Sequence, residues 1–375
     1  MSRLFVMCGL QGSGKTTIAN NLAVDRCLHN MFVLSSDEIR KEFPNAKNEK
    51  IFKILYERMN DLLYKNKDVV VDATNTTIKA RKNLLSNIKH ECHKTCLIVN
   101  TPYELCLERV RNRNKKKDSH FVPEEVVEMY YRSFEIPFYE EGWNSIELHY
   151  QPEYFKSNVY MDELLERAKT FNQNNKHHTQ LLGDHMETAC KYLENKVCSA
   201  NVIKACKYHD IGKMFTQTYK KGDPNAHYYD HANVGAYELM CFGGIFDKEW
   251  RMFNLRSTLE WLFYINYHMK MHDIKTEKAI KKWKSIFGEF KFDGLKLLNE
   301  ADCFRGEVTQ TENKKKVYDI DDAKVKLYYD VSQPVTIGKP ISPGPYITVV
   351  DDDAVLDYNP FPQWYYETMP IREEE

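Results

Sequence analysis

The clearest chemical signal in the sequence is a glycine-rich loop near its start. Residues 9–16 fit G-x-x-x-x-G-K-[ST] at every fixed position, after an apolar run and before a helical pattern. Glycines let the backbone curl so that successive N–H groups face one anion, and the following helix N-terminus adds partial positive charge. We expect Lys15 to reach the β- and γ-phosphates of ATP and the Thr16 hydroxyl to bind Mg²⁺. The predicted nucleotide site comprises Gly9, Gly12, Ser13, Gly14, Lys15, Thr16 and Thr17.

A carboxylate and a cation follow the second strand-like run. Asp37 and Arg40 come just after residues 31–34, which places Asp37 at the carboxyl edge of a parallel sheet, where such folds bind ligands. Asp37 can accept the proton of an attacking hydroxyl, and Arg40 can hold an anionic group of the acceptor. The alternative is a helix-capping Asp beside a surface Arg, and the spacing alone does not choose between the two interpretations.

Two further segments favour a kinase over other P-loop proteins. Residues 72–75 end a run of three valines, where polar side chains serve a site or cap the next helix, and Arg81 follows on that helix. The basic segment 109–117 follows the strand-like run 97–99 and can close over the transferring phosphate as a lid. The common alternative for such a charge run is a solvated helix face.

Together these segments resemble the polynucleotide 5′-kinase family, the P-loop phosphotransferases of nucleic-acid end repair. The resemblance spans about residues 3–150 and continues past the lid into residues 122–142. It implies that Asp37 is the general base, that Arg40 contacts the acceptor's phosphate and that Arg113 clamps the donor phosphates. Lys117 stands where family members often carry a second lid arginine. The same fold also phosphorylates small molecules, so the acceptor stays open.

Histidine and aspartate recur through the second half of the chain. In order, these residues are His185, His209, Asp210, His231, His268 and Asp302. Imidazole and carboxylate together suit Mn²⁺, Fe²⁺, Ni²⁺, Co²⁺ or Zn²⁺, and such a centre can activate water and hold a phosphate oxygen. Each histidine alone is more often a core or surface residue, but their recurrence in a helical region favours a metal centre.

This order resembles the HD phosphohydrolase superfamily, in which a His, a His-Asp doublet and a distant Asp bind metal. The resemblance spans about residues 176–305 and implies a metal site of His185, His209, Asp210 and Asp302. It also implies a catalytic role for Asp210 and a contact of Lys213 with a substrate phosphate. His231 and His268 match positions that hold a second metal in binuclear members. The less well placed histidines, expected at most around the ligands or the substrate, are His177, His178, His227 and His272.

Apolar periodicity predicts two modules. Strand-like runs alternate with helical patterns over residues 1–152, which predicts an α/β P-loop kinase fold with a parallel sheet and helices on both faces. A linker is expected over 153–176, and an all-α HD domain over 177–305. Residues 306–375 are expected to form an irregular or β-containing extension packed on that domain.

Composition narrows the class of protein. A chain of 375 residues suits two domains, and a formal net charge of −1 gives no global basic field, so local patches would have to hold a nucleic acid. No apolar run is long enough to cross a bilayer and the N-terminus lacks signal-peptide features, so we expect a cytoplasmic protein without a membrane partner. The ten cysteines, several in apolar segments, suit a reducing compartment.

The fused pair resembles the bifunctional end-healing enzymes of RNA repair, although their HD module comes first and here the kinase does. The resemblance implies phosphorylation of 5′-OH ends of RNA or DNA and removal of a 2′,3′-cyclic phosphate or 3′-phosphate. It also implies an RNA ligase acting downstream. Two alternatives stay open: a small-molecule or nucleoside kinase fused to a nucleotide phosphohydrolase, and an ATP-binding regulatory or scaffold protein with a degenerate HD fold.

Overall fold

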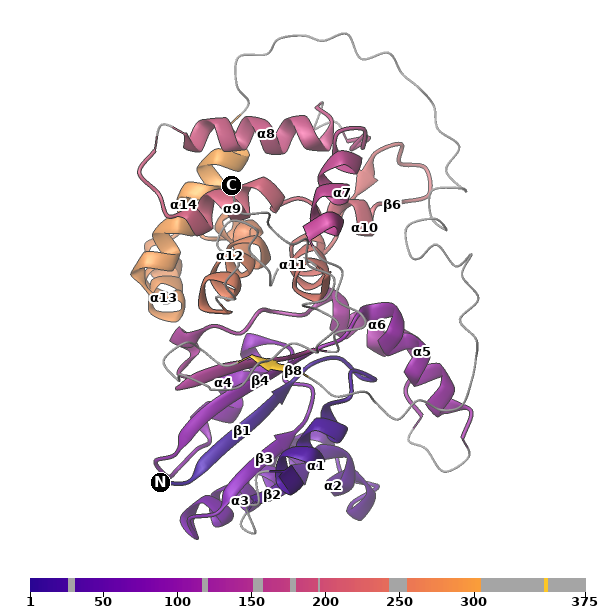
Figure 1. Ribbon diagram of the computed structural model, residues 1–375, viewed down its shortest axis with the longest axis vertical. Coiled ribbons are helices and arrows are strands. Elements are labelled where there is room, and N and C mark those ends of the chain that lie inside the picture. The colour runs from indigo at the N-terminus through magenta and orange to yellow at the C-terminus, as the bar shows by residue number, and fades with distance from the viewer. Residues whose placement is uncertain are drawn as a thin grey trace, which may run out of the picture.

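The first part of the chain folds into a parallel sheet with helices on both faces (Figure 1). The computed structural model describes residues 1–25, 31–116, 121–150, 158–175, 180–194, 196–242, 255–304 and 347–349. The strands of this part are β1 (Arg3–Cys8), β2 (Met31–Ser35), β3 (Asp68–Asp72), β4 (His93–Asn100) and β5 (Ser145–Tyr150). Its helices are α1 (Lys15–Asp25), α2 (Ser36–Glu42), α3 (Asn48–Tyr64), α4 (Ile78–Ser86), α5 (Tyr103–Asn114), α6 (Glu124–Arg132) and the 3₁₀ helix η1 (Tyr139–Glu141).

The strand order shows where a ligand can bind. The five strands are parallel in the order β2-β3-β1-β4-β5. The chain places β2 and β3 on one side of β1 and then crosses to β4 and β5 on the other. The carboxyl end of β1 is therefore the point where the strand order reverses, which is where open α/β sheets bind ligands. This architecture confirms the predicted α/β P-loop kinase fold.

The two faces of the sheet are covered differently. Phe5 and Met7 of β1 face α1, which packs Ile18 against them. Leu4 and Val6 point to the opposite face and join the larger core with α3 and α4. Helix α3 suits this position because its buried apolar residues recur every four positions, at Ile51, Leu55, Met59 and Leu63.

The second part of the chain is helical, as predicted. The helical unit consists of α7 (Asn158–Ala168), α8 (Leu182–Leu193), α9 (Ala200–Tyr208), α10 (Lys213–Thr216), α11 (His231–Phe242), α12 (Leu255–Tyr267), η3 (His268–Asp273), α13 (Glu277–Phe287) and α14 (Glu289–Cys303). A short hairpin of β6 (Thr218–Tyr219) and β7 (Ala226–His227) precedes α11. Side-chain caps begin two of the helices: the oxygen of Ser199 accepts from Val202 N, and that of Thr276 accepts from Ala279 N.

Two predicted segments lie partly outside the described residues. The segment 153–176, expected as a linker, contains α7. Of the extension 306–375, the structure describes only β8 (Ile347–Val349), which pairs antiparallel with β5 at the edge of the sheet. The domain boundaries stay a prediction.

The sheet and the helical unit share one continuous core, which runs from Leu4 in β1 to Leu298 in α14. Aromatic side chains join them: the Phe138 ring lies 4.9 Å from that of Phe263 in α12. Asn266, also in α12, accepts from Ile136 N at 2.9 Å and donates to the Phe134 carbonyl at 3.1 Å. The two parts therefore depend on each other for burial of their apolar surface.

A fully buried ion pair fastens helix α4 to the 3₁₀ helix η1. Arg81 donates through Nε and Nη2 to the two carboxylate oxygens of Glu141, each at 2.7 Å, and neither side chain is exposed. Its Nη1 donates to the carbonyls of Asn75 at 3.2 Å and Glu135 at 2.9 Å. Asn75 in turn has a left-handed φ of 45° and donates to the Met7 carbonyl in β1 at 2.9 Å. Arg81 and Asn75 thus connect α4, the segment after α6 and β1.

Helix α11 carries a second buried polar contact between the two parts. Glu238 accepts a hydrogen bond from the Tyr131 hydroxyl of α6 at 2.5 Å, and both residues are buried. Burial raises the pKa of Glu238 to about 7; the Tyr131 hydrogen bond lowers it, and the charge of Glu104 adds to the increase. The carboxyl group is therefore held near the middle of its titration at neutral pH.

We predict that Glu238→Gln gains stability relative to the wild type as pH rises. The unfolded chain releases the proton around the ordinary pKa of 4.5, whereas the folded wild type keeps it until about pH 7, so the stability of the wild type falls as pH rises through that window. Glutamine accepts the same hydrogen bond without a charge, so the relative gain is on the order of 3 kcal/mol from pH 4 to pH 8. Calorimetric melting at both pH values checks this, and a difference that does not change with pH would contradict a raised pKa.

Candidate functional site

The phosphate loop has the curled backbone that its glycines predict. Gly12 and Gly14 have φ values of 80° and 96°, which L side chains rarely adopt. A Cβ at Gly12 would lie 2.4 Å from the carbonyl oxygen of Cys106 in α5, so this position also lacks room for a side chain. Gly9 N donates to the Thr74 carbonyl at 3.0 Å, which holds the start of the loop beside β3.

Lys15 and Thr16 begin α1 at the carboxyl end of β1. The Lys15 ammonium donates to the Leu10 carbonyl of its own loop, and burial lowers its pKa. The Thr16 hydroxyl donates to Asp72 Oδ2 at 2.7 Å. Burial raises the pKa of Asp72, against the hydrogen bond from Thr16 and the charge of Lys15. Hydroxyl and carboxylate oxygens are the ligands that Mg²⁺ prefers, and Asp72 is a site residue that sequence reasoning did not assign.

Asp37 and Arg40 are brought together in α2, one strand away from Asp72. Arg40 Nη1 donates to Asp37 Oδ1 at 2.7 Å and to Ser36 Oγ at 3.2 Å. Ser35 at the end of β2 pairs in register with Asp72 at the end of β3. The two residues expected to handle the acceptor therefore stand at the same edge of the sheet as the phosphate loop, and more than half of the Asp37 side chain is exposed.

Helix α5 brings the basic segment to the phosphate loop. Arg109 Nη1 donates to the Gly12 carbonyl at 3.4 Å, a contact that the sequence did not single out. Arg113, expected to clamp the donor phosphates, lies one turn further along α5 and is half-buried. Arg111 instead pairs with Glu124 of α6 on the surface. Lys117, at the end of the predicted lid, lies outside the described residues.

We predict that Gly12→Ala lowers both stability and ATP affinity. The added methyl group would collide with a backbone oxygen in α5, and the positive φ is itself unfavourable for alanine. A matched control at another glycine with positive φ should show only the φ penalty, about 1–2 kcal/mol. That control is Gly222→Ala, where φ is +83° and a Cβ meets nothing within 4 Å. Thermal melting and calorimetric titration with ATP separate the variants, and equal effects at both positions would show that the Cys106 contact is unimportant.

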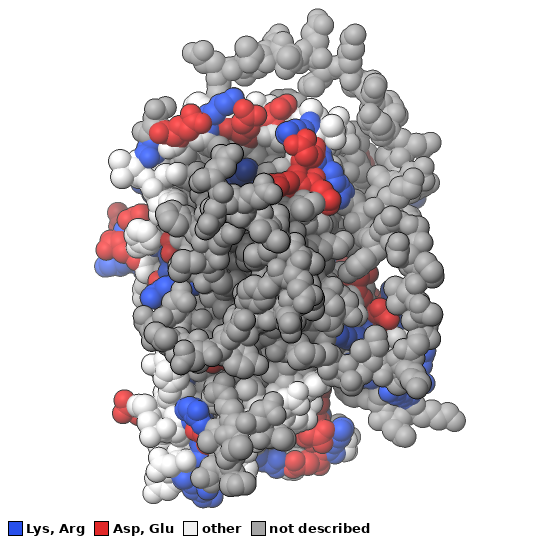
Figure 2. Space-filling model, in the orientation of Figure 1, with Lys and Arg blue, Asp and Glu red and all other residues white. Residues whose placement is uncertain are grey.

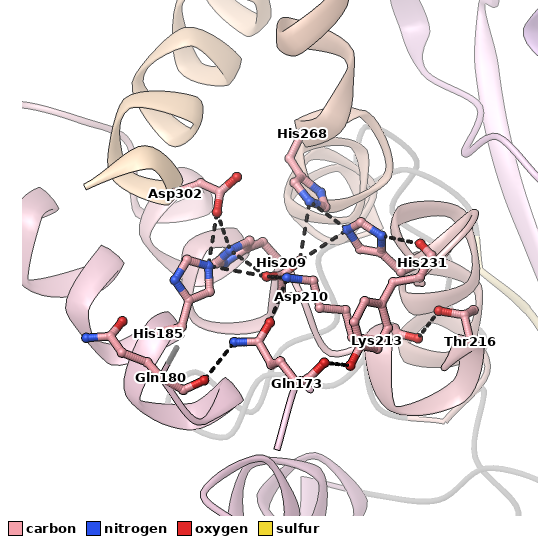
Figure 3. Close-up of polar contacts among 12 residues, drawn as sticks. Gln173, Gln180, His185, His209, Asp210, Lys213, Thr216, His231, His268 and Asp302 are labelled. Atoms are coloured by element: carbon pink, nitrogen blue, oxygen red, sulfur yellow. Dashed lines mark hydrogen bonds and ion pairs between the residues drawn. The ribbon is translucent and has the colours of Figure 1, made fainter. Parts of the chain in front are cut away.

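The six predicted metal ligands come together in the helical unit (Figure 3). They form two groups, His185, His209, Asp210 and Asp302, and Asp210, His231 and His268, in each of which the ligand atoms lie within 4.8 Å of one another. His185 comes from α8, Asp302 from α14 and His231 from the start of α11. We call these six residues the His–Asp cluster. Asp210 belongs to both groups and so lies between them.

Three imidazoles of the cluster are oriented in the same way. The Nδ1 atoms of His209, His231 and His268 each bond a backbone carbonyl three residues earlier, at 2.7, 2.8 and 2.7 Å. A backbone carbonyl only accepts, so each Nδ1 carries the hydrogen and each Nε2 is left as the ligand atom. The Nε2 atoms of His231 and His268 face each other at 3.2 Å (Figure 3).

The electrostatics of the cluster suit a cation. Burial alone lowers the pKa of His209, but the charges of Asp210 and Asp302 outweigh it and raise the pKa to about 9. Burial raises the pKa of Asp302, yet hydrogen bonds from imidazoles hold it far below its usual range. His209 Nε2 is buried between two carboxylates, 3.4 Å from Asp302 Oδ1 and 3.5 Å from Asp210 Oδ2. These observations fit a divalent metal, because the carboxylates attract positive charge to the imidazole nitrogen, where a metal would take the place of a proton.

Lys213 stands beside the cluster with a buried glutamine. Its ammonium lies 2.6 Å from Asp210 Oδ2 and donates to Gln173 Oε1 at 2.9 Å (Figure 3). Gln173 was not predicted from the sequence; its amide nitrogen donates to the Gln180 carbonyl at 3.1 Å and it is fully buried.

The four histidines that were expected at most around the ligands or the substrate lie in different places. His272 Nε2 lies 3.7 Å from Asp302 Oδ2, at the margin of the cluster. His227 pairs with Asp223 at 3.0 Å in the hairpin loop. His177 and His178 lie outside the described residues.

A protein family matches the N-terminal part of the chain, and several solved structures resemble a share of it. Residues 4–137 match the family described as an AAA domain. A chain of the Pnkp1/Rnl/Hen1 RNA repair complex is 22% identical with a TM-score of 0.31, over 34% of this chain and 42% of that chain. A gluconokinase from Sinorhizobium meliloti 1021 is 16% identical with a TM-score of 0.29, over 40% and 84% of the two chains. Shikimate kinase from Acinetobacter baumannii is 21% identical with a TM-score of 0.25, over 35% and 74%.

Structural similarities of this size assign neither an activity nor a substrate. This chain spans less than half the length of the RNA repair chain that it matches. The family match, the phosphate loop and the strand order together make residues 4–137 a kinase-like P-loop module, a fold that implies ATP and Mg²⁺. Within the described residues, no helix is both long and apolar enough to cross a membrane.

Proposed function

We propose that this protein is a nucleic-acid end-healing enzyme that acts on RNA. The P-loop module phosphorylates 5′-OH ends, and the helical unit is an HD-type phosphohydrolase that removes a 2′,3′-cyclic phosphate or 3′-phosphate. The observation that carries the proposal is the His–Asp cluster, with two donor sets around Asp210, in the same core as a phosphate loop. The phosphate loop suits the transfer of a phosphoryl group to a substrate, and the His–Asp cluster suits the removal of a phosphate from one.

In the proposed kinase step, the 5′-hydroxyl oxygen attacks the γ-phosphorus of ATP, the bond from that phosphorus to the bridging oxygen breaks, and ADP leaves. Asp37 accepts the hydroxyl proton and Arg40 holds the neighbouring phosphate of the acceptor. Lys15 and Arg113 neutralise the charge that develops on the transferring group. The pairing of Thr16 with Asp72 supports Mg²⁺ at this position, and the exposure of Asp37 leaves it accessible to an acceptor.

In the proposed phosphohydrolase step, His185, His209, Asp210 and Asp302 would hold one divalent ion, and Asp210, His231 and His268 would hold a second. Ions such as Mn²⁺, Ni²⁺, Co²⁺ or Fe²⁺ supply Lewis acidity and an activated water when bound there. Lys213, whose ammonium is already beside Asp210, neutralises the departing phosphate. The tautomers of three of the imidazoles are fixed by the backbone, so these residues need no rearrangement to act as ligands.

The formal net charge and the visible described surface bear on how a nucleic acid would be held. Where described residues are visible in Figure 2, basic and acidic side chains are interspersed on this face. With a formal net charge of −1, the chain is expected to hold the end of a strand locally at each site. A healed end is the substrate of a ligase, so an RNA ligase acting downstream in the cytoplasm is the partner that we propose.

We predict that the two activities can be abolished separately. Lys15→Ala or Asp37→Ala should reduce 5′-phosphorylation at least a hundredfold and leave 3′-end dephosphorylation intact, because general-base catalysis alone contributes about 10²–10⁴-fold. Asp210→Ala should do the reverse. An end-labelled RNA with a 5′-OH and a 2′,3′-cyclic phosphate, incubated with ATP, Mg²⁺ and Mn²⁺, reports both ends. Phosphorylation of nucleosides or small molecules, but of no oligonucleotide, would support the small-molecule kinase alternative.

We also predict a metal content of two ions per chain in the cluster. His268→Ala should lose one ion, because it removes a ligand from one donor set only, whereas Asp210→Ala should lose both. Elemental analysis after dialysis against Mn²⁺ measures the content, with His90→Ala as a control at a histidine remote in sequence from the cluster. A wild-type protein without bound metal would favour the scaffold alternative.

A further inference from the structure

One helix contributes to both candidate sites. Helix α11 begins at His231 in the His–Asp cluster and continues to the carboxyl end of β4, beside the phosphate loop (Figure 1). Its second and third turns carry Tyr237, Glu238 and Cys241, all buried. Cys241 Sγ contacts Asn100 Oδ1 at 2.6 Å, and Asn100 Nδ2 donates to the Met240 carbonyl at 2.7 Å. These two contacts bind the end of β4 to α11.

A first chain of hydrogen bonds leads from α11 to the phosphate loop. The Tyr237 hydroxyl donates to the Thr101 carbonyl at 2.6 Å. The Thr101 hydroxyl donates to the Ser13 carbonyl at 2.9 Å. All three residues are at most 1% exposed, so water does not compete for these bonds. Tyr237 thereby holds Thr101 in place, and Thr101 holds the phosphate loop at Ser13.

A second chain of contacts reaches the neighbouring loop residue. Glu238 accepts from Tyr131, whose ring stacks on Tyr103 at a centroid distance of 4.1 Å and an interplanar angle of 7°. Tyr103 is the first residue of α5, the helix that provides the Arg109 contact with the Gly12 carbonyl. The two chains converge on adjacent residues, Gly12 and Ser13.

We propose that α11 is a positioning element of the kinase, in which Tyr237 holds the phosphate loop in its nucleotide-binding conformation through Thr101. The inference rests on the proposed function, because it requires that the loop bind ATP. A curled glycine loop has many alternative conformations, and a contact that restricts them lowers the entropy that nucleotide binding must otherwise overcome. The helical unit thus contributes to ATP affinity without touching ATP.

The test compares three full-length variants. Tyr237→Phe removes one hydroxyl and keeps the ring, which packs edge-on against Phe134 at 4.9 Å. Thr101→Val removes the next hydroxyl in the chain with little change of shape. The matched control is Tyr264→Phe in α12, because the Tyr264 hydroxyl is equally buried and has no hydrogen-bond partner among the described residues.

We expect the dissociation constant for ATP, measured by calorimetric titration with Mg²⁺, to rise about fivefold in Tyr237→Phe and in Thr101→Val, the effect of one neutral hydrogen bond. It should not change in Tyr264→Phe. The double variant should bind ATP only as weakly as the weaker single variant, because both hydroxyls act through one chain. The KM for ATP should rise in parallel while the rate of 3′-end dephosphorylation stays at the wild-type value.

Three outcomes would overturn the inference. Wild-type ATP affinity in both Tyr237→Phe and Thr101→Val would remove the positioning role and leave the proposed function standing. A parallel loss of dephosphorylation in these variants would indicate general damage instead of positioning. Failure of the wild type itself to bind ATP would overturn the proposed kinase together with the inference. Should Tyr237→Phe not fold, as judged by thermal melting, Thr101→Val alone decides.

Discussion

The buried pair of Arg81 and Glu141 is the contact on which the arrangement of the kinase-like module most depends. A guanidinium without any exposed surface is costly, and here it is balanced by two bonds to one carboxylate and two to backbone carbonyls. Through Asn75 the pair reaches the carboxyl end of β1, and through Glu141 it reaches the segment that packs on the helical unit. One side chain thus joins α4, the loop after β3 that bonds to β1, and the segment after α6 that packs on the helical unit.

Local motifs predicted which residues form the candidate sites better than they predicted the long-range contacts that those residues make. The phosphate loop and the His-Asp doublet are short, and their physical requirements are local: glycine at positive φ, and an imidazole next to a carboxylate. Asp72 was missed as a partner of Thr16 because the two are 56 residues apart and meet only when β3 pairs with β1. The sequence does not predict that Arg81 is buried, because its carboxylate partner Glu141 is 60 residues away.

The overall layers were predictable for a similar reason. Continuous valines in β3 and the four-residue spacing in α3 each report their own burial, so the alternation of strands and helices can be read along the chain. The sharing of one core by both parts cannot be read in this way. It depends on side chains such as Phe138 and Asn266, whose contacts are made with elements far away in the sequence, so no local pattern indicates them.

The shared core also sets an order of events during synthesis. Phe138 leaves the ribosome long before its partner Phe263, and at about 5–20 residues per second the delay is roughly ten seconds. Once residue 150 has emerged, the five parallel strands are complete in sequence, but Phe138 still lacks Phe263, against which it packs. The nascent chain therefore presents an apolar edge of the kind that chaperones bind, and the first half of the protein matures only when the second half has been translated.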